Sequence, residues 1–176
     1  MDILAHSLWA GVGVAFAARR IAIRRRTAVA TVALAGLPDV VQLAPLLVWA
    51  ALGPGTLAAL IEFSLASPGQ EPALPAMTGM LSHHLHCALH SAVIAGLTTL
   101  LLWLWLGKFW LPLAGWWSHI VIDFFTHSAD YYAVPVLYPF SYWGFDGLAW
   151  NTPWFLALNY ALLTLCIIAL AWTRRR

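Results

Sequence analysis

Long apolar stretches, separated by short loops that contain glycine, proline or arginine, make up most of this chain. An α-helix needs about 20 mainly apolar residues to cross the hydrocarbon core of a bilayer. The pattern predicts apolar helices over residues 3–18, 81–106, 109–128 and 154–172. The predicted fold class is therefore all-α, a polytopic transmembrane helix bundle with roughly four to six spans.

Two intermediate stretches leave the number of spans open. Residues 27–53 are apolar, but Gly36, Pro38 and Pro45 interrupt them, which predicts a broken helix or two short ones. Residues 56–66 are too short to cross a bilayer and are expected to be interfacial or re-entrant. One broken or re-entrant segment is therefore expected within the bundle.

The composition supports a membrane location. Hydrophobic residues make up 62% of the chain and charged residues only 9%, and the mean hydropathy is +0.79, outside the range of soluble domains. The eleven tryptophans suit anchoring at the membrane interface. At 176 residues the chain is expected to form a single integral membrane domain, 1–176, with membrane lipid as its surroundings.

The positive charges are gathered in short clusters at residues 19–26, at Lys108 and at residues 174–176. Short basic loops next to apolar spans set membrane orientation, so the clusters favour a role in topology over nucleic-acid binding. If residues 27–53 cross once, all the clusters fall on the cytoplasmic side. No nucleic-acid partner is expected, and the oligomeric state stays open.

Ionisable side chains recur at helical spacing inside two of the apolar segments. One segment carries His83, His86 and His90, and the other carries His119, Asp123 and His127. Each residue of an α-helix advances about 100°, so each set shares one face of its helix. Groups that can carry charge are costly inside a bilayer, and they are normally paired or functional there.

Imidazole and carboxylate pairs one helical turn apart are typical of helical zinc sites. His6 and Asp39 are expected at a similar depth, in the outer half of the bilayer. The predicted metal ligands are His6, His86, His90, His119 and Asp123, with Asp39 as a further ligand or as the catalytic general base. The alternatives are a proton relay and a structural network of polar side chains between helices.

Several short motifs follow one another along residues 2–145. In order they are His6-Ser7, Gly36-Leu37-Pro38-Asp39, His86-Cys87-Ala88-Leu89-His90-Ser91, Gly115 to Asp123, Thr126-His127 and Tyr138-Pro139-Phe140-Ser141. Together they resemble the predicted membrane-bound, metal-dependent hydrolases of the bacterial inner membrane that were first described as LexA-regulated. That family shows an early TH, an LPD, an H…THS and an SHxxxD, followed by a threonine and a PF segment.

The resemblance implies a polar core of His6, Asp39, His90, His119 and Asp123, and a location in the bacterial inner (plasma) membrane. The chain departs from the family pattern at four places. Val40-Val41 replaces the second acid, the Arg-Gly of the H…THS motif is missing, Leu89 replaces a threonine, and the spacing from His86 to His90 is shorter.

The predicted function is that of a metal-dependent hydrolase. Zinc best fits imidazole and carboxylate ligands, with manganese or iron as alternatives. The expected depth of the site favours a lipid or a lipid-linked phosphoester as the substrate. The same histidines could instead serve a transporter of metal ions or protons, because interrupted helices near polar residues are also a feature of transporters.

Overall fold

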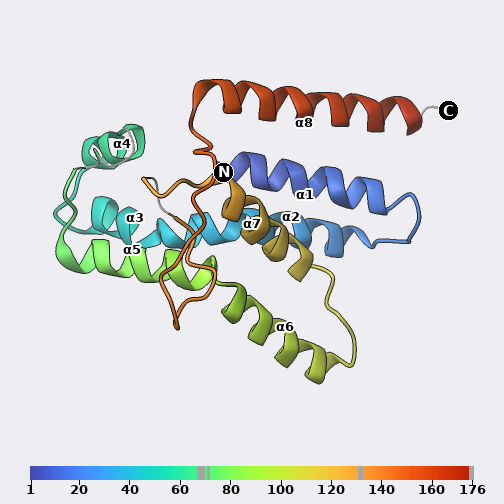
Figure 1. The fold of residues 1–176 in the computed structure, drawn as a ribbon, viewed down its shortest axis with the longest axis horizontal. Coiled ribbons are helices and arrows are strands. Elements are labelled where there is room, and N and C mark those ends of the chain that lie inside the picture. The colour runs from blue at the N-terminus through green and yellow to red at the C-terminus, as the bar shows by residue number, and fades with distance from the viewer. Residues whose placement is uncertain (67–69, 71, 131–132, 175–176) are drawn as a thin grey trace.

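The computed structural model describes residues 1–66, 70, 72–130 and 133–174 (Figure 1). The described part of the chain contains helices joined by loops and no strands, which confirms the all-α prediction. The helices are α1 (Ile3–Ala17), α2 (Arg25–Gln42), α3 (Ala44–Leu52), α4 (Leu57–Leu65), α5 (Ala76–Leu89), α6 (Ala92–Leu106), α7 (Leu113–Thr126) and α8 (Pro153–Arg174).

Helix α2 forms the centre of the bundle. It packs against α1, α7 and α5, with Ser82 and His86 of α5 bonded to Gln42 at its C-terminal end, and α1 also packs against α8. Figure 1 shows α1, α2 and α8 running along the long axis, with α7 crossing in the middle, close to the N-terminus. Helix α4 lies at one end and, among the described helices, contacts only α3.

The predicted count of four to six spans is not confirmed. In the described part of the chain, α8 alone is long and apolar enough to cross a membrane as one helix. The pairs α2–α3 and α5–α6 qualify only as bent pairs, which raises the number to at most three. The physical reason is length, since α1 and α7 have 15 and 14 residues and a spanning helix needs about 20.

The break predicted within residues 27–53 is confirmed, but it lies next to Pro45 and not at Gly36 and Pro38. Helix α2 continues through Gly36 and Pro38, and the 54° bend to α3 comes at Leu43. Packing explains the continuity at Gly36, because a Cβ there would lie 2.7 Å from the Ser7 hydroxyl oxygen of α1. Pro45 occupies the first turn of α3, where the missing N–H breaks no helical hydrogen bond.

The prediction of one continuous helix over residues 81–106 is wrong. Helices α5 and α6 meet at a 59° bend at His90 and Ser91. The Ser91 hydroxyl oxygen accepts hydrogen bonds from the N–H groups of Val93 and Ile94, and the hydroxyl donates to the Tyr138 carbonyl at 2.5 Å. A serine that caps the next helix and binds a distant loop thus ends the apolar run, which apolar periodicity alone does not reveal.

Gly115 allows the closest approach between α7 and α2. A Cβ at this position would lie 1.9 Å from the carbonyl oxygen of Thr31, which is backbone and cannot move aside alone. The approach carries the α7 side chains His119 and Asp123 towards α2. We therefore attribute the position of His119 and Asp123 next to α2 to this glycine.

Replacing Gly115 with alanine is expected to lower the free energy of unfolding by about 2–3 kcal/mol, because overpacked side chains force the backbone apart. Gly13 is the matched control, since a Cβ there meets nothing within 4 Å and alanine is favoured in a helix by about 1 kcal/mol. Chemical unfolding in detergent, followed by circular dichroism, measures both variants. Equal stability of the two alanine variants would contradict the close approach.

Candidate metal centre

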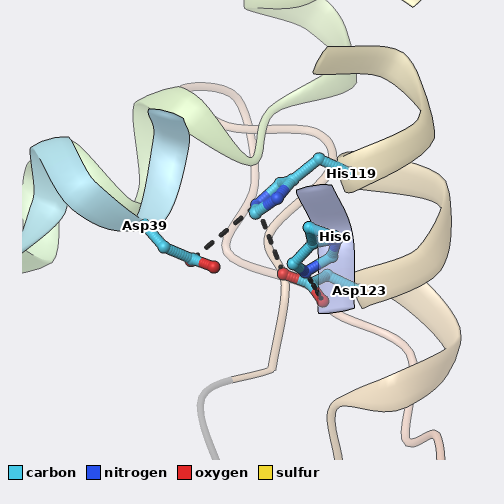
Figure 2. Close-up of side chains that lie close together, drawn as sticks. All are labelled: His6, Asp39, His119 and Asp123. Carbon is cyan, nitrogen blue, oxygen red and sulfur yellow. Dashed lines mark hydrogen bonds and ion pairs between the residues drawn. The ribbon is translucent and has the colours of Figure 1, made fainter. Parts of the chain in front are cut away.

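Five buried ionisable side chains meet at the middle of the described structure. They come from α1, α2, the bend after α5, and α7. Their exposed fractions are 1% for His6, 7% for Asp39 and 0% for His90, His119 and Asp123. Figure 2 shows four of them, His6, Asp39, His119 and Asp123, pointing towards one another from three different helices.

Four of these side chains surround a common point. The Nε2 atoms of His90 and His119 are 2.9 Å apart, and each is 3.3 Å from Oδ2 of Asp123. Oδ1 of Asp39 lies 3.5 Å from Nε2 of His90 and 3.8 Å from Nε2 of His119. Two imidazole nitrogens and two carboxylates therefore face one small volume.

Backbone contacts orient both imidazole rings. Nδ1 of His119 is 2.8 Å from the Ala35 carbonyl oxygen, and Nδ1 of His90 is 2.9 Å from the His86 carbonyl oxygen. A carbonyl oxygen only accepts, so each Nδ1 carries the proton and each Nε2 of a neutral ring is an acceptor. Two acceptors at 2.9 Å repel each other unless a proton or a metal ion lies between them.

The two 3.3 Å distances to Asp123 match those between ligand atoms of one divalent metal ion, and the other three distances, from 2.9 to 3.8 Å, lie close to that range. With metal–ligand distances of about 2.0–2.1 Å, neighbouring ligand atoms of one zinc ion lie roughly 3.0–3.4 Å apart. The ligand atoms of His6, Asp39, His119 and Asp123 all lie within 4.8 Å of one another. This buried group could hold a metal ion, and the contact between Nδ1 of His119 and the Ala35 carbonyl is of the kind that usually supports a metal-binding histidine.

His6 approaches the opposite side of the Asp123 carboxylate. Its Nε2 is 2.9 Å from Oδ1 of Asp123, and its ring packs against His119 with the ring centroids 4.0 Å apart. The nitrogen of Met1 also contacts Oδ1, and Nε2 of His127 lies 3.5 Å from Oδ2. The Asp123 carboxylate therefore lies at the centre of the site.

The structure places His86 beside the cluster. Its ring lies against that of His90, with the centroids 4.2 Å apart, and its Nδ1 is 2.7 Å from Oε1 of Gln42. Its neighbour His83 is exposed and is not part of the cluster, although both share a helix face with His90. His90 is the last of this set, and the bend after α5 directs it inward.

Gln42 is a site residue that sequence reasoning missed. Its Nε2 donates to Oδ1 of Asp39 at 3.2 Å, while its Oε1 accepts from Nδ1 of His86. The available signal was its position one helical turn after Asp39. An amide in an apolar segment has many uses, however, and its link to His86 exists only in the folded chain.

If Asp39 is a metal ligand, replacing Gln42 with leucine is expected to weaken metal affinity about 10- to 100-fold, the usual cost of losing a group that orients a ligand. Gln70→Leu is the control, because this exposed loop residue is remote from the cluster in sequence. Competition with a coloured chelator measures both affinities. Unchanged affinity in Gln42→Leu would show that the amide does not support the metal ligands.

Comparison of the chain with protein-family models, with curated proteins and with solved structures finds no match. Membership of the inner-membrane hydrolase family therefore stays a prediction from the motifs.

Proposed function

We propose that this protein is a membrane-embedded, metal-dependent hydrolase that acts on a lipid or a lipid-linked phosphoester. The observation that carries the proposal is the facing pair of Nε2 atoms of His90 and His119, 2.9 Å apart, next to two buried carboxylates. A divalent ion between the two Nε2 atoms would remove their repulsion and neutralise the two buried carboxylates.

In this proposal His90, His119 and Asp123 hold the ion, and His6 orients Asp123 from the other side. A divalent ion supplies Lewis acidity and lowers the pKa of a bound water towards about 7. Asp39 lies farther than Asp123 from Nε2 of His90 and His119. It also lines a cavity next to the site. That position suits a general base that accepts the proton of the attacking water, or a further ligand.

Zinc is the metal that best fits two to three imidazoles with one or two carboxylates, and manganese or iron are the alternatives. Cys87, the buried cysteine of α5, contacts His83 at 3.5 Å instead of joining the cluster. A ligand set of nitrogen and oxygen without thiolate is compatible with all three metals, so affinity measurements have to separate them.

A membrane location is supported by the apolar surface of the long helices. Trp105 on α6 and Leu165 on α8 are 79% and 61% exposed, among many large apolar side chains that face outward. Such extended apolar surface needs lipid or a partner to cover it. We propose that α8 and the two bent pairs cross the bilayer, and that the shorter α1 and α7 lie between them.

The basic clusters support one orientation. Arg19 donates to the Leu170 carbonyl at 3.4 Å, so the α1–α2 loop lies next to the C-terminal end of α8. In Figure 1 the α6–α7 loop, which carries Lys108, lies towards the same end of the long axis. Under the positive-inside rule this end is cytoplasmic, and the bacterial inner membrane is the location that the motifs suggest.

A transporter of metal ions or protons is the second candidate. The observation that favours it is the position of the two bends, since Asp39 and Gln42 precede one of them and His90 lies at the other. Broken helices whose ends meet at polar side chains also form the ion sites of secondary transporters. The same histidines would then pass a cation on instead of holding it.

The two candidates separate in one set of measurements. The detergent-purified protein, loaded with zinc or stripped by chelator, is incubated with phosphomonoesters, phosphodiesters and acyl esters, and ion flux is measured in proteoliposomes. We expect hydrolysis of one ester class by the metal-loaded protein, lost on stripping and in His119→Ala. Metal-loaded protein that conducts ions and cleaves none of these esters would overturn the hydrolase proposal.

A further inference from the structure

A cavity of about 590 Å³ adjoins the candidate metal centre. Its polar lining includes Asp39, Gln42, His86 and His127. Because Asp39 belongs to the candidate metal centre, the cavity borders that centre directly. Its volume is within the range of about 300–1,000 Å³ that small-molecule sites occupy. A molecule in this cavity would therefore lie next to Asp39 of the candidate metal centre.

The remaining lining is largely apolar and belongs to other elements. Leu43 lies at the bend after α2, Phe63 lies on α4, and Leu74 lies before α5. Figure 1 shows α4 next to α3, at the end of the molecule away from α7, and the lining residues show that the cavity extends from Asp39 to α4. A molecule that fills this cavity needs a polar part next to the candidate metal centre and an apolar part next to α4.

The charges of the lining restrict the polar part further. The described lining contains the carboxylates of Asp2 and Asp39 but no lysine and no arginine, and Met1, which also lines the cavity, uses its ammonium group to bind Asp123. Oδ1 of Asp2 accepts hydrogen bonds from the Ala5 N–H and the Tyr160 hydroxyl, and its buried Oδ2 has no hydrogen-bond partner among the described residues. A metal ion would attract one phosphate charge, but a second negative charge next to Asp2 would meet repulsion, whereas a cationic or hydrogen-bond-donating head there would meet a carboxylate.

We infer that the substrate is an amphiphilic phosphodiester with a cationic head, whose apolar chain lies between Leu43 and Phe63. This inference rests on the proposed hydrolase function and names the substrate class of the same site. The phosphodiester would reach the metal cluster, the head would lie near Asp2, and the chain would extend towards α4. Helix α4, which among the described helices contacts only α3, is the element next to which such a chain would enter.

Photolabelling tests the inference without requiring turnover. The probe is an alkylphosphocholine with a diazirine in its chain, added to the full-length protein in maltoside detergent, and the labelled peptides are identified by mass spectrometry. We expect labels on residues 57–66 and 72–86, and competition by unlabelled alkylphosphocholine. The Leu43→Trp variant, which fills the apolar part, should lose these labels, whereas Leu165→Trp on the exposed face of α8 should keep them.

The head group is tested with a matched alkyl phosphate probe that carries the same chain. We expect about tenfold weaker labelling of the cavity by this dianionic probe. The difference between the probes should be smaller in Asp2→Asn, which removes the negative charge but keeps the cap of α1.

Equal labelling by the two probes, or labels confined to α8, would overturn the inference. Hydrolysis of a water-soluble phosphodiester without cavity labelling would overturn it and leave the proposed function standing. Cavity labelling without hydrolysis of any ester would instead overturn the proposed function and the substrate role.

Discussion

Replacing Asp123 with asparagine is expected to release the metal ion from this protein. Asp123 is fully buried, and His6, His90 and His119 all contact its carboxylate. Asparagine keeps the shape but removes the negative charge and one acceptor oxygen. Loss of an outer-shell partner costs about 10- to 100-fold in metal affinity, so the loss of this central ligand should exceed 100-fold.

Metal content after dialysis, together with competitive chelator titration, measures the Asp123→Asn effect. Circular dichroism establishes that the variant is still helical. Asp146→Asn is the matched control, because the Asp146 carboxylate accepts from the Ala129 N–H at 2.8 Å in a loop outside the cluster. We expect this control to bind metal like the unaltered chain. A folded Asp123→Asn protein with full metal content and unaltered affinity would contradict the proposed centre.

Replacing Asp39 with asparagine is expected to reduce turnover about 100- to 10,000-fold and to leave the metal bound, if Asp39 is the general base. Its Oδ1 lies 3.5 and 3.8 Å from the Nε2 atoms of His90 and His119, farther than Asp123. An asparagine oxygen can still accept the hydrogen bond from Gln42, so local packing should persist. The lost property is the ability to take up a proton.

Two measurements separate the possible roles of Asp39. The pH dependence of kcat/KM should lose its acidic limb in Asp39→Asn, because that limb reports protonation of the base. Metal content should stay at the level of the unaltered protein. Loss of the metal together with activity would assign Asp39 as a ligand and contradict the general-base role.

The limits of sequence reasoning are clearest at the two helix bends. Gly36 and Pro38 predicted a break, but α2 continues through them because its contacts with α1 and α7 offset the unfavourable local preference. The bend at Ser91 has the opposite origin, since a cap and the bond to the Tyr138 carbonyl interrupt a strongly apolar run. Local propensity is a weak guide where packing partners outweigh it.

The sequence by itself determined the apolar helices and the chemistry available to them. The four-residue spacing of His119 and Asp123 was enough to place both on one face, because the helical period depends only on the backbone. The helical spacing is local and can be obtained from a single segment. The metal prediction needed more, because it depended on two such sets of side chains together with His6 and Asp39.

Only the tertiary structure decided which groups form one site. His90 joins the cluster while His86 lies beside it, and Asp39 meets histidines from two other parts of the chain. The close approach at Gly115, the bend at Ser91 and the cavity next to Asp39 depend on contacts between residues far apart in sequence. Helical periodicity carries no information about such contacts, because they are chosen by how whole helices pack against one another.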